Sequence, residues 1–213
     1  MKCQIRSHMG LYKMPPTQVF ELLDGQLVVF LRSWGSQDYN QKFIDEIGHF
    51  LSTAQADIEV TSPFEFLESQ TALANKVRIS ILLAHDYFIK SENKNSFSVG
   101  FEVAILMRHK KEIAWGAVGR FDIQKCSDKG SVTLSAVGTE RDEVILLPIE
   151  LVGVEKSIEI RLGSIHLSNE FLVVGSAFNG KLNFKLGSTA NNLEFAEPVK
   201  EESSYWFSSI KLD

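Results

Sequence analysis

The side chains best suited to chemistry are scattered along this sequence and do not gather into motifs. The two cysteines, Cys3 and Cys126, lie far apart in no C-x-x-C pattern, which favours two unpaired thiols in a reducing compartment. Neither G-x-S-x-G nor G-x-G-x-x-G occurs. The five histidines show no H-x-x-x-H spacing and no cysteine neighbour that would indicate a zinc site: His8, His49, His85, His109 and His166.

One stretch comes close to a phosphate-binding loop. Residues Gly175–Lys181 fit G-x-x-x-x-G-K after an apolar run. That loop also needs a hydroxyl after the lysine for Mg²⁺ and a helix whose N-terminus faces the phosphates. Leu182 stands at the hydroxyl position, and Leu182–Leu186 alternates like a strand. The sequence therefore argues against nucleotide binding here.

Composition excludes several classes of protein. The chain has 213 residues, of which 44% are hydrophobic and 23% charged, as expected for one globular domain over residues 1–213. The net charge of -5 argues against nucleic acid as a partner. No secretory signal pattern and no apolar run of about 20 residues occurs, so we expect a cytoplasmic protein without a membrane span.

The elements that would position a site begin with a hairpin and two helices. Val19–Leu23 and Gln26–Leu31 are typical of strands, and Asp24-Gly25 between them predicts a tight turn. Apolar residues recur at helical spacing over Tyr39–Thr53. A second helix is predicted over Pro63–Lys90, with Ser62 as its cap, and the two helices are expected to pack antiparallel.

After residue 95 the pattern is that of an antiparallel meander. Together these elements predict an α+β fold of two stacked antiparallel sheets flanked by helices, with the helical layer on one face reduced or missing. Residues 1–17 are expected to be peripheral, 18–178 to form the core, and 179–204 to be a polar segment. The predicted strands are Ser96–Arg108, Glu112–Gln124, Ser131–Ala136, Ile145–Leu151, Ser157–Leu162, Glu170–Ser176 and Tyr205–Leu212.

Six segments in chain order carry a family pattern: Val29–Gly35, Gly100–Met107, Ala114–Gly119, Leu147–Gly153, Ile158–Leu167 and Phe171–Ser176. They resemble successive strands of the PPM-type (protein phosphatase 2C-like) metal-dependent Ser/Thr phosphatases. The two predicted helices fall where that family has an antiparallel helix pair. The resemblance implies an αββα sandwich. It also implies a site where carboxylates hold two divalent metals and a bridging water attacks a phosphate.

This sequence departs from the family at every recognisable metal-binding aspartate. An arginine or alanine there supplies no oxygen ligand, and two divalent ions need several. Asp38 and Asp122 are the nearest acids, but Asp38 suits a helix start better. We call the positions that correspond to these aspartates and their motifs the degenerate positions. They are Arg32 and Ser33 on the first strand, Gly119 and Arg120 where the family has Gly-Asp-Ser, Ala177 where it has Ser-Asp-Gly, and Ser203-Ser204 before the last strand.

The leading interpretation is a catalytically inactive PPM-like pseudophosphatase that acts as a binding or regulatory module for a protein partner, without a cofactor. One alternative is a divergent phosphohydrolase that uses Mg²⁺ or Mn²⁺. Another is an unrelated α+β protein-binding module. Arg32 and Arg120 either bind an anion or, as we favour, pair with nearby carboxylates or solvent.

The segment before the last strand predicts an oligomer. Asn179–Ser204 shows no helical stripe, so we expect it to be too short to cover the second sheet. An apolar face left bare would favour a symmetric homodimer, with a heterologous partner as the alternative.

Overall fold

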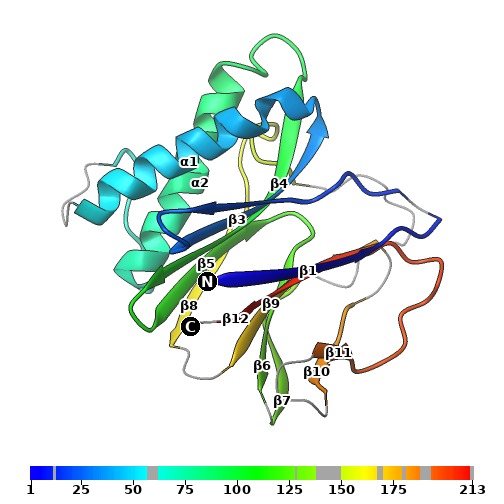
Figure 1. Ribbon diagram of the computed structural model, residues 1–213. Coiled ribbons are helices and arrows are strands. Elements are labelled where there is room, and N and C mark those ends of the chain that lie inside the picture. Colours follow the sequence, from blue (N-terminus) through cyan, green and yellow to red (C-terminus); the bar gives the residue numbers. More distant parts are fainter. Residues whose placement is uncertain are drawn as a thin grey trace. The chain divides into compact units, whose positions relative to one another are not determined.

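The computed structural model describes residues 1–11, 13–56, 62–127, 129–137, 150–166, 170–178, 181–187 and 193–211 (Figure 1). The chain forms two compact units. The helical unit comprises Pro16–Gly119 and Pro148–His166. The all-β unit comprises Met1–Pro15, Arg120–Leu147 and Leu167–Asp213. One domain over residues 1–213 stays a prediction.

The helical unit is built on a five-stranded antiparallel sheet. Its strands, in spatial order, are β2 (Gln18–Leu22), β3 (Leu27–Gly35), β4 (Val99–His109), β5 (Glu112–Val118) and β8 (Arg161–His166). The two central strands, β3 and β4, are buried over most of their length. This burial explains their nearly continuous apolar sequences.

The predicted hairpin is confirmed, but its turn is longer than expected. Leu22 pairs with Leu27, so four residues form the loop. Three of them have a positive φ: Leu23 (52°), Asp24 (53°) and Gly25 (75°). A two-residue turn would need two such residues. The Asp-Gly signal therefore located the turn correctly and misjudged its length.

Two helices cover one face of this sheet (Figure 1). The first, α1 (Asn40–Ala56), follows a 3₁₀ turn at Gln37–Tyr39, and the second is α2 (Ala72–Lys90). They are antiparallel, as predicted, because Lys76 near the start of α2 bonds the Ala54 carbonyl near the end of α1. Their apolar stripes pack on the odd-numbered residues of β3, including Leu27, Val29 and Leu31.

The second helix begins nine residues later than Pro63. Thr71 is its N-cap and accepts a hydrogen bond from the Ala74 amide at 3.2 Å. The buried Asn75 side chain bonds both the amide and the carbonyl of Leu67, which holds the preceding segment as a loop. Ser62 accepts a bond from the Phe64 amide, but this makes a local turn. The capping pattern at Ser62 was therefore misread.

The all-β unit contains a second five-stranded antiparallel sheet. In spatial order its strands are β1 (Lys2–His8), β12 (Tyr205–Lys211), β9 (Phe171–Ala177), β6 (Asp122–Ser127) and β7 (Gly130–Ser135). A separate hairpin pairs β10 (Phe184–Leu186) with β11 (Leu193–Phe195). β1 lies in the segment expected to be peripheral, yet it pairs with β12 along its whole length.

Two predicted strands differ most from the observed ones. The strand Glu112–Gln124 is interrupted at Gly119, whose φ is +84°, and its halves β5 and β6 belong to different sheets. The predicted strand Ser157–Leu162 begins at Arg161 instead, although Ile158 and Ile160 still pack on the core. Residues 145–149 of another predicted strand lie outside the described part.

The segment before β12 covers one face of its sheet, contrary to expectation. Leu182, Phe184 and Leu193 are nearly fully buried in one cluster with Val173 and Phe207. The premise that this segment is too short to cover a face is therefore wrong. Its hairpin supplies aromatic side chains in place of helices. The homodimer therefore remains a prediction, and an uncovered sheet face no longer supports it.

The predicted α+β fold class is confirmed, since two helices accompany sheets that are antiparallel throughout the described chain. Among the described residues, no helix is long and apolar enough to cross a membrane.

The start of α2 can be tested with two cap substitutions. We expect Thr71→Ala to lower the free energy of unfolding by about 1 kcal/mol, because it leaves a helix amide without its acceptor. The matched control Ser62→Ala should lower it clearly less. Chemical denaturation followed by circular dichroism measures both. A larger loss of unfolding free energy for Ser62→Ala than for Thr71→Ala would indicate that the helix begins near Pro63.

Candidate functional site

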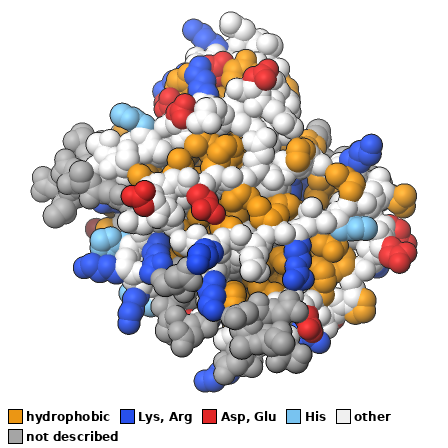
Figure 2. Space-filling model, in the orientation of Figure 1, with side chains coloured by type: hydrophobic (Ala, Val, Ile, Leu, Met, Phe, Trp, Pro, Cys, Tyr) orange, Lys and Arg blue, Asp and Glu red, His pale blue; other side chains and the backbone are white. Residues whose placement is uncertain are grey.

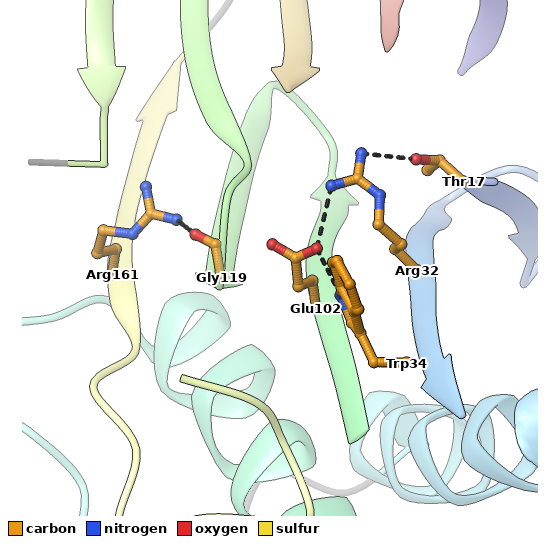
Figure 3. A network of polar contacts seen from close by, with 6 residues as sticks. All are labelled: Thr17, Arg32, Trp34, Glu102, Gly119 and Arg161. Atoms are coloured by element: carbon orange, nitrogen blue, oxygen red, sulfur yellow. Dashed lines mark hydrogen bonds and ion pairs between the residues drawn. The ribbon is translucent and has the colours of Figure 1, made fainter. Parts of the chain in front are cut away.

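A buried ion pair joins the central strands of the helical unit. Arg32 on β3 lies directly opposite Glu102 on β4. Its Nη1 donates to Glu102 Oε2 at 3.0 Å, and the two side chains are 1% and 0% exposed. Leu31 faces the helices, so alternation along the strand places Arg32 on the opposite face. This pair is the centre of the polar network in Figure 3.

Two neighbours add hydrogen bonds to this pair. Trp34, two residues along β3 and on the same face, donates from its indole nitrogen to Glu102 Oε2 at 2.9 Å. Thr17 accepts from Arg32 Nη2 at 3.1 Å. One carboxylate oxygen thus accepts two donors, one of them charged. Such charge-assisted bonds are among the strongest that side chains make.

Gly119 directly follows β5 and lies beside Glu102. A Cβ at this position would lie 2.5 Å from Glu102 Cγ and 2.9 Å from Oε1, and φ is +84°. Only glycine suits both the space and this backbone conformation. The Gly119 carbonyl accepts a bond from Arg161 Nη2 at 2.6 Å. Figure 3 shows Arg161 and Arg32 on either side of Glu102.

The donor set does not fit a pair of divalent metals. Among the six residues in Figure 3 there is one carboxylate, Glu102, beside two guanidinium groups. Two such metals require several oxygen ligands whose negative charge offsets the repulsion between the ions. Nowhere in the described chain do three His, Cys, Asp or Glu side chains gather as a metal site.

The structure brings the other degenerate positions together in the all-β unit. Ala177, the last residue of β9, pairs with Tyr205, the first of β12. The Phe178 amide donates to the Ser204 carbonyl at 2.9 Å. The Arg120 guanidinium lies over the Phe178 ring at 5.7 Å from its centroid. Arg120, Ala177 and Ser204 thus form one group in this unit, whereas Arg32, Ser33 and Gly119 belong to the helical unit.

The two acids considered as replacement ligands have structural partners. Asp38 lies in the 3₁₀ turn and accepts a bond from the Ser36 hydroxyl at 2.9 Å, as expected for a residue at a helix start. Asp122 accepts a bond from the Val137 amide at 2.8 Å.

Glu102 was missed by the sequence analysis. It is a lone charged residue within the apolar run Val99–Met107, and a charge in a buried strand indicates a partner. That signal was available, but identifying Arg32 as the partner requires the β3–β4 register. The favoured expectation that Arg32 pairs with a carboxylate agrees with this geometry.

A second buried polar group fastens the 151–155 segment to α2. His85 Nδ1 accepts a bond from the Gly153 amide at 3.0 Å, which places the proton of the neutral ring on Nε2. Burial lowers the pKa of His85, and the nearby carboxylates of Glu155 and Asp86 oppose this only in part. The ring is therefore held neutral as an acceptor.

The comparisons with known proteins identify the fold. The phosphatase PstP/Ppp of Mycobacterium tuberculosis is similar with a TM-score of 0.57 and 9% identity, over 99% of each chain. The PPM Ser-Thr phosphatase MsPP of Mycobacterium smegmatis gives 0.60 at 9% identity, over 100% of this chain and 99% of the other. PppA of Pseudomonas aeruginosa, described as a key regulatory component of T6SS, gives 0.59 at 12%, over 99% and 97%.

No family model and no curated protein matches this sequence. At such low identity, the likeness shows the fold alone. The chain has the fold of PPM-type Ser/Thr phosphatases, and the resemblance found in the sequence is confirmed at that level.

The buried ion pair can be tested by removing one partner. We expect Arg32→Met to lower the free energy of unfolding by about 3–5 kcal/mol, because Glu102 would remain as an uncompensated buried charge. The double variant Arg32→Met/Glu102→Leu should recover much of this loss. Chemical denaturation measures both. The control Lys90→Met breaks an exposed ion pair with Asp86 and should change stability little. An equally small effect for Arg32→Met would contradict the account.

The protonation of His85 predicts a pH dependence of stability. Its pKa is lower in the folded chain than the ordinary value of about 6.5, so below that pH the unfolded chain binds more protons. Stability should therefore fall as the pH drops below about 6.5, by up to about 1.4 kcal/mol per pH unit from this group. In His85→Gln this part of the slope should vanish. The control His109→Gln, at the exposed end of β4, should keep it. Identical slopes in wild type and His85→Gln would contradict the assignment.

Proposed function

We propose that this chain is a catalytically inactive PPM-fold protein, a pseudophosphatase that acts by binding other proteins. The observation that carries the proposal is the Arg32–Glu102 ion pair. Arg32 stands where the family pattern has its first metal-binding aspartate, and its guanidinium neutralises the carboxylate beside it. The proposal is that this internal cation takes the place of the metals.

The electrostatics of the network support this proposal. A divalent ion approaching Glu102 would have to displace Arg32 from a 3.0 Å contact and Trp34 from a 2.9 Å contact on the same oxygen. It would then face two guanidinium groups, those of Arg32 and Arg161, with one carboxylate to offset them. Both effects disfavour metal binding, and the family reaction depends on metal-bound water.

The retained scaffold supports a binding role. Residues of the helical unit still form a packed core around β3, β4 and the two helices. Gly119 still closes on Glu102 with no room for a side chain. A fold that keeps its packing while its metal ligands are replaced is suited to recognition, in which surfaces matter more than reacting groups.

Turnover of a phosphate ester tests this proposal. We expect no hydrolysis of p-nitrophenyl phosphate or of a phosphoserine peptide above the buffer rate, with Mg²⁺ or Mn²⁺ present. The control Glu102→Gln should behave identically, because the proposal assigns Glu102 no catalytic task. Metal-dependent turnover that is lost in Glu102→Gln would favour the divergent phosphohydrolase instead.

A further inference from the structure

The all-β unit ends in a strand whose outer edge lacks a neighbour. β1 is the first strand of its sheet, and within the described residues no strand pairs with its other side. Such an edge presents backbone N–H and C=O groups that another strand can bond. β1 is paired to β12 from Lys2, opposite Lys211, to His8, opposite Tyr205. The edge is therefore preorganised for a further strand.

One face of this edge is basic. Side chains alternate along a strand, so Lys2, Arg6 and His8 share a face, and all three are exposed. Lys211, directly opposite Lys2, adds a fourth basic residue to that face. Figure 2 shows basic and hydrophobic side chains interspersed on the side of the molecule over which β1 runs in Figure 1.

Three exposed apolar residues lie on the other face of β1 and just after the strand. Ile5 is 52% exposed on the face opposite to Arg6, and Met9 and Leu11 are 60% and 75% exposed. The backbone of this segment is nevertheless held in place. The Gly10 amide donates to the Ser204 hydroxyl at 2.8 Å, and the Leu11 amide donates to the Glu202 carbonyl at 3.0 Å. Fixed apolar side chains in water are typical of an interaction surface.

We infer that the β1 edge binds an extended segment of a partner protein in which acidic and apolar residues alternate. The segment adds as a sixth strand, its backbone bonding β1, its acidic side chains lying beside Lys2 and Arg6, and an apolar one beside Ile5. This inference names the surface for the proposed binding role and rests on that role.

A second copy of the chain fits this edge poorly. Two β1 strands paired antiparallel about Ile5 would place Lys2 of each copy opposite His8 of the other, and the Arg6 side chains close by. Basic residues directly opposite each other destabilise a strand pair. A self-pair would therefore bring like charges together, whereas an acidic segment would bring opposite charges together.

Fluorescence anisotropy with labelled heptapeptides tests the inference on the full chain. We expect a peptide of alternating Glu and Val to bind, and one of alternating Lys and Val not to bind. The variant Lys2→Glu/Arg6→Glu should weaken the acidic peptide by about tenfold or more and bind the basic one instead. The matched control Lys129→Glu/Lys185→Glu changes the net charge equally in the same unit at exposed positions, and should bind like wild type. Circular dichroism verifies that both variants fold.

Three outcomes would overturn the inference: no binding of the acidic peptide to wild type, equal weakening by both variants, or sedimentation as a dimer that Lys2→Glu/Arg6→Glu disrupts. If the acidic peptide does not bind, the basic residues would instead serve to prevent β1 from pairing with other strands. None of them would produce phosphatase turnover, so a failure here is distinct from a failure of the proposed function.

Discussion

The ion pair between Arg32 and Glu102 is the interaction on which the rest of the account depends. A buried charge is costly unless it is paired and hydrogen-bonded, so each residue fixes the other. The pair also fixes the surroundings. Trp34 must direct its indole nitrogen at the same oxygen, and position 119 must be glycine because Glu102 fills the space beside it. The charge of Glu102 is thereby neutralised by a side chain of the protein itself.

The helices and sheet of this unit explain why such a pair is held so closely. α1 and α2 bury the odd-numbered face of β3, which leaves the even-numbered Arg32 on the other face. The β3–β4 register then sets Glu102 directly opposite. A slip of β3 by one residue against β4 would turn Arg32 toward the helices and away from Glu102. The packing of apolar residues therefore determines the polar geometry.

Much of this could be predicted from the sequence, and the failures have physical causes. Apolar runs and helical spacing located β3, β4, α1, β9 and β12, because burial of one or both faces imposes such patterns. The start of α2 was wrong because Ser62 and Thr71 both offer capping oxygens, and the tertiary contacts of Asn75 decide between them. β1, with its exposed and polar residues, carries little pattern, so its pairing with β12 was not foreseen. The partner of Arg32 depends on strand register, a long-range property that no local pattern contains.

The most direct test of the central claim is a Mn²⁺ titration followed by electron paramagnetic resonance, in which bound Mn²⁺ loses the sharp signal of the free ion. The account predicts that the wild-type protein leaves the signal of micromolar Mn²⁺ unchanged, because Arg32 already neutralises Glu102. Loss of the signal in wild type, with its return in Glu102→Gln that circular dichroism shows to be folded, would show that the carboxylate binds metal and would contradict the account.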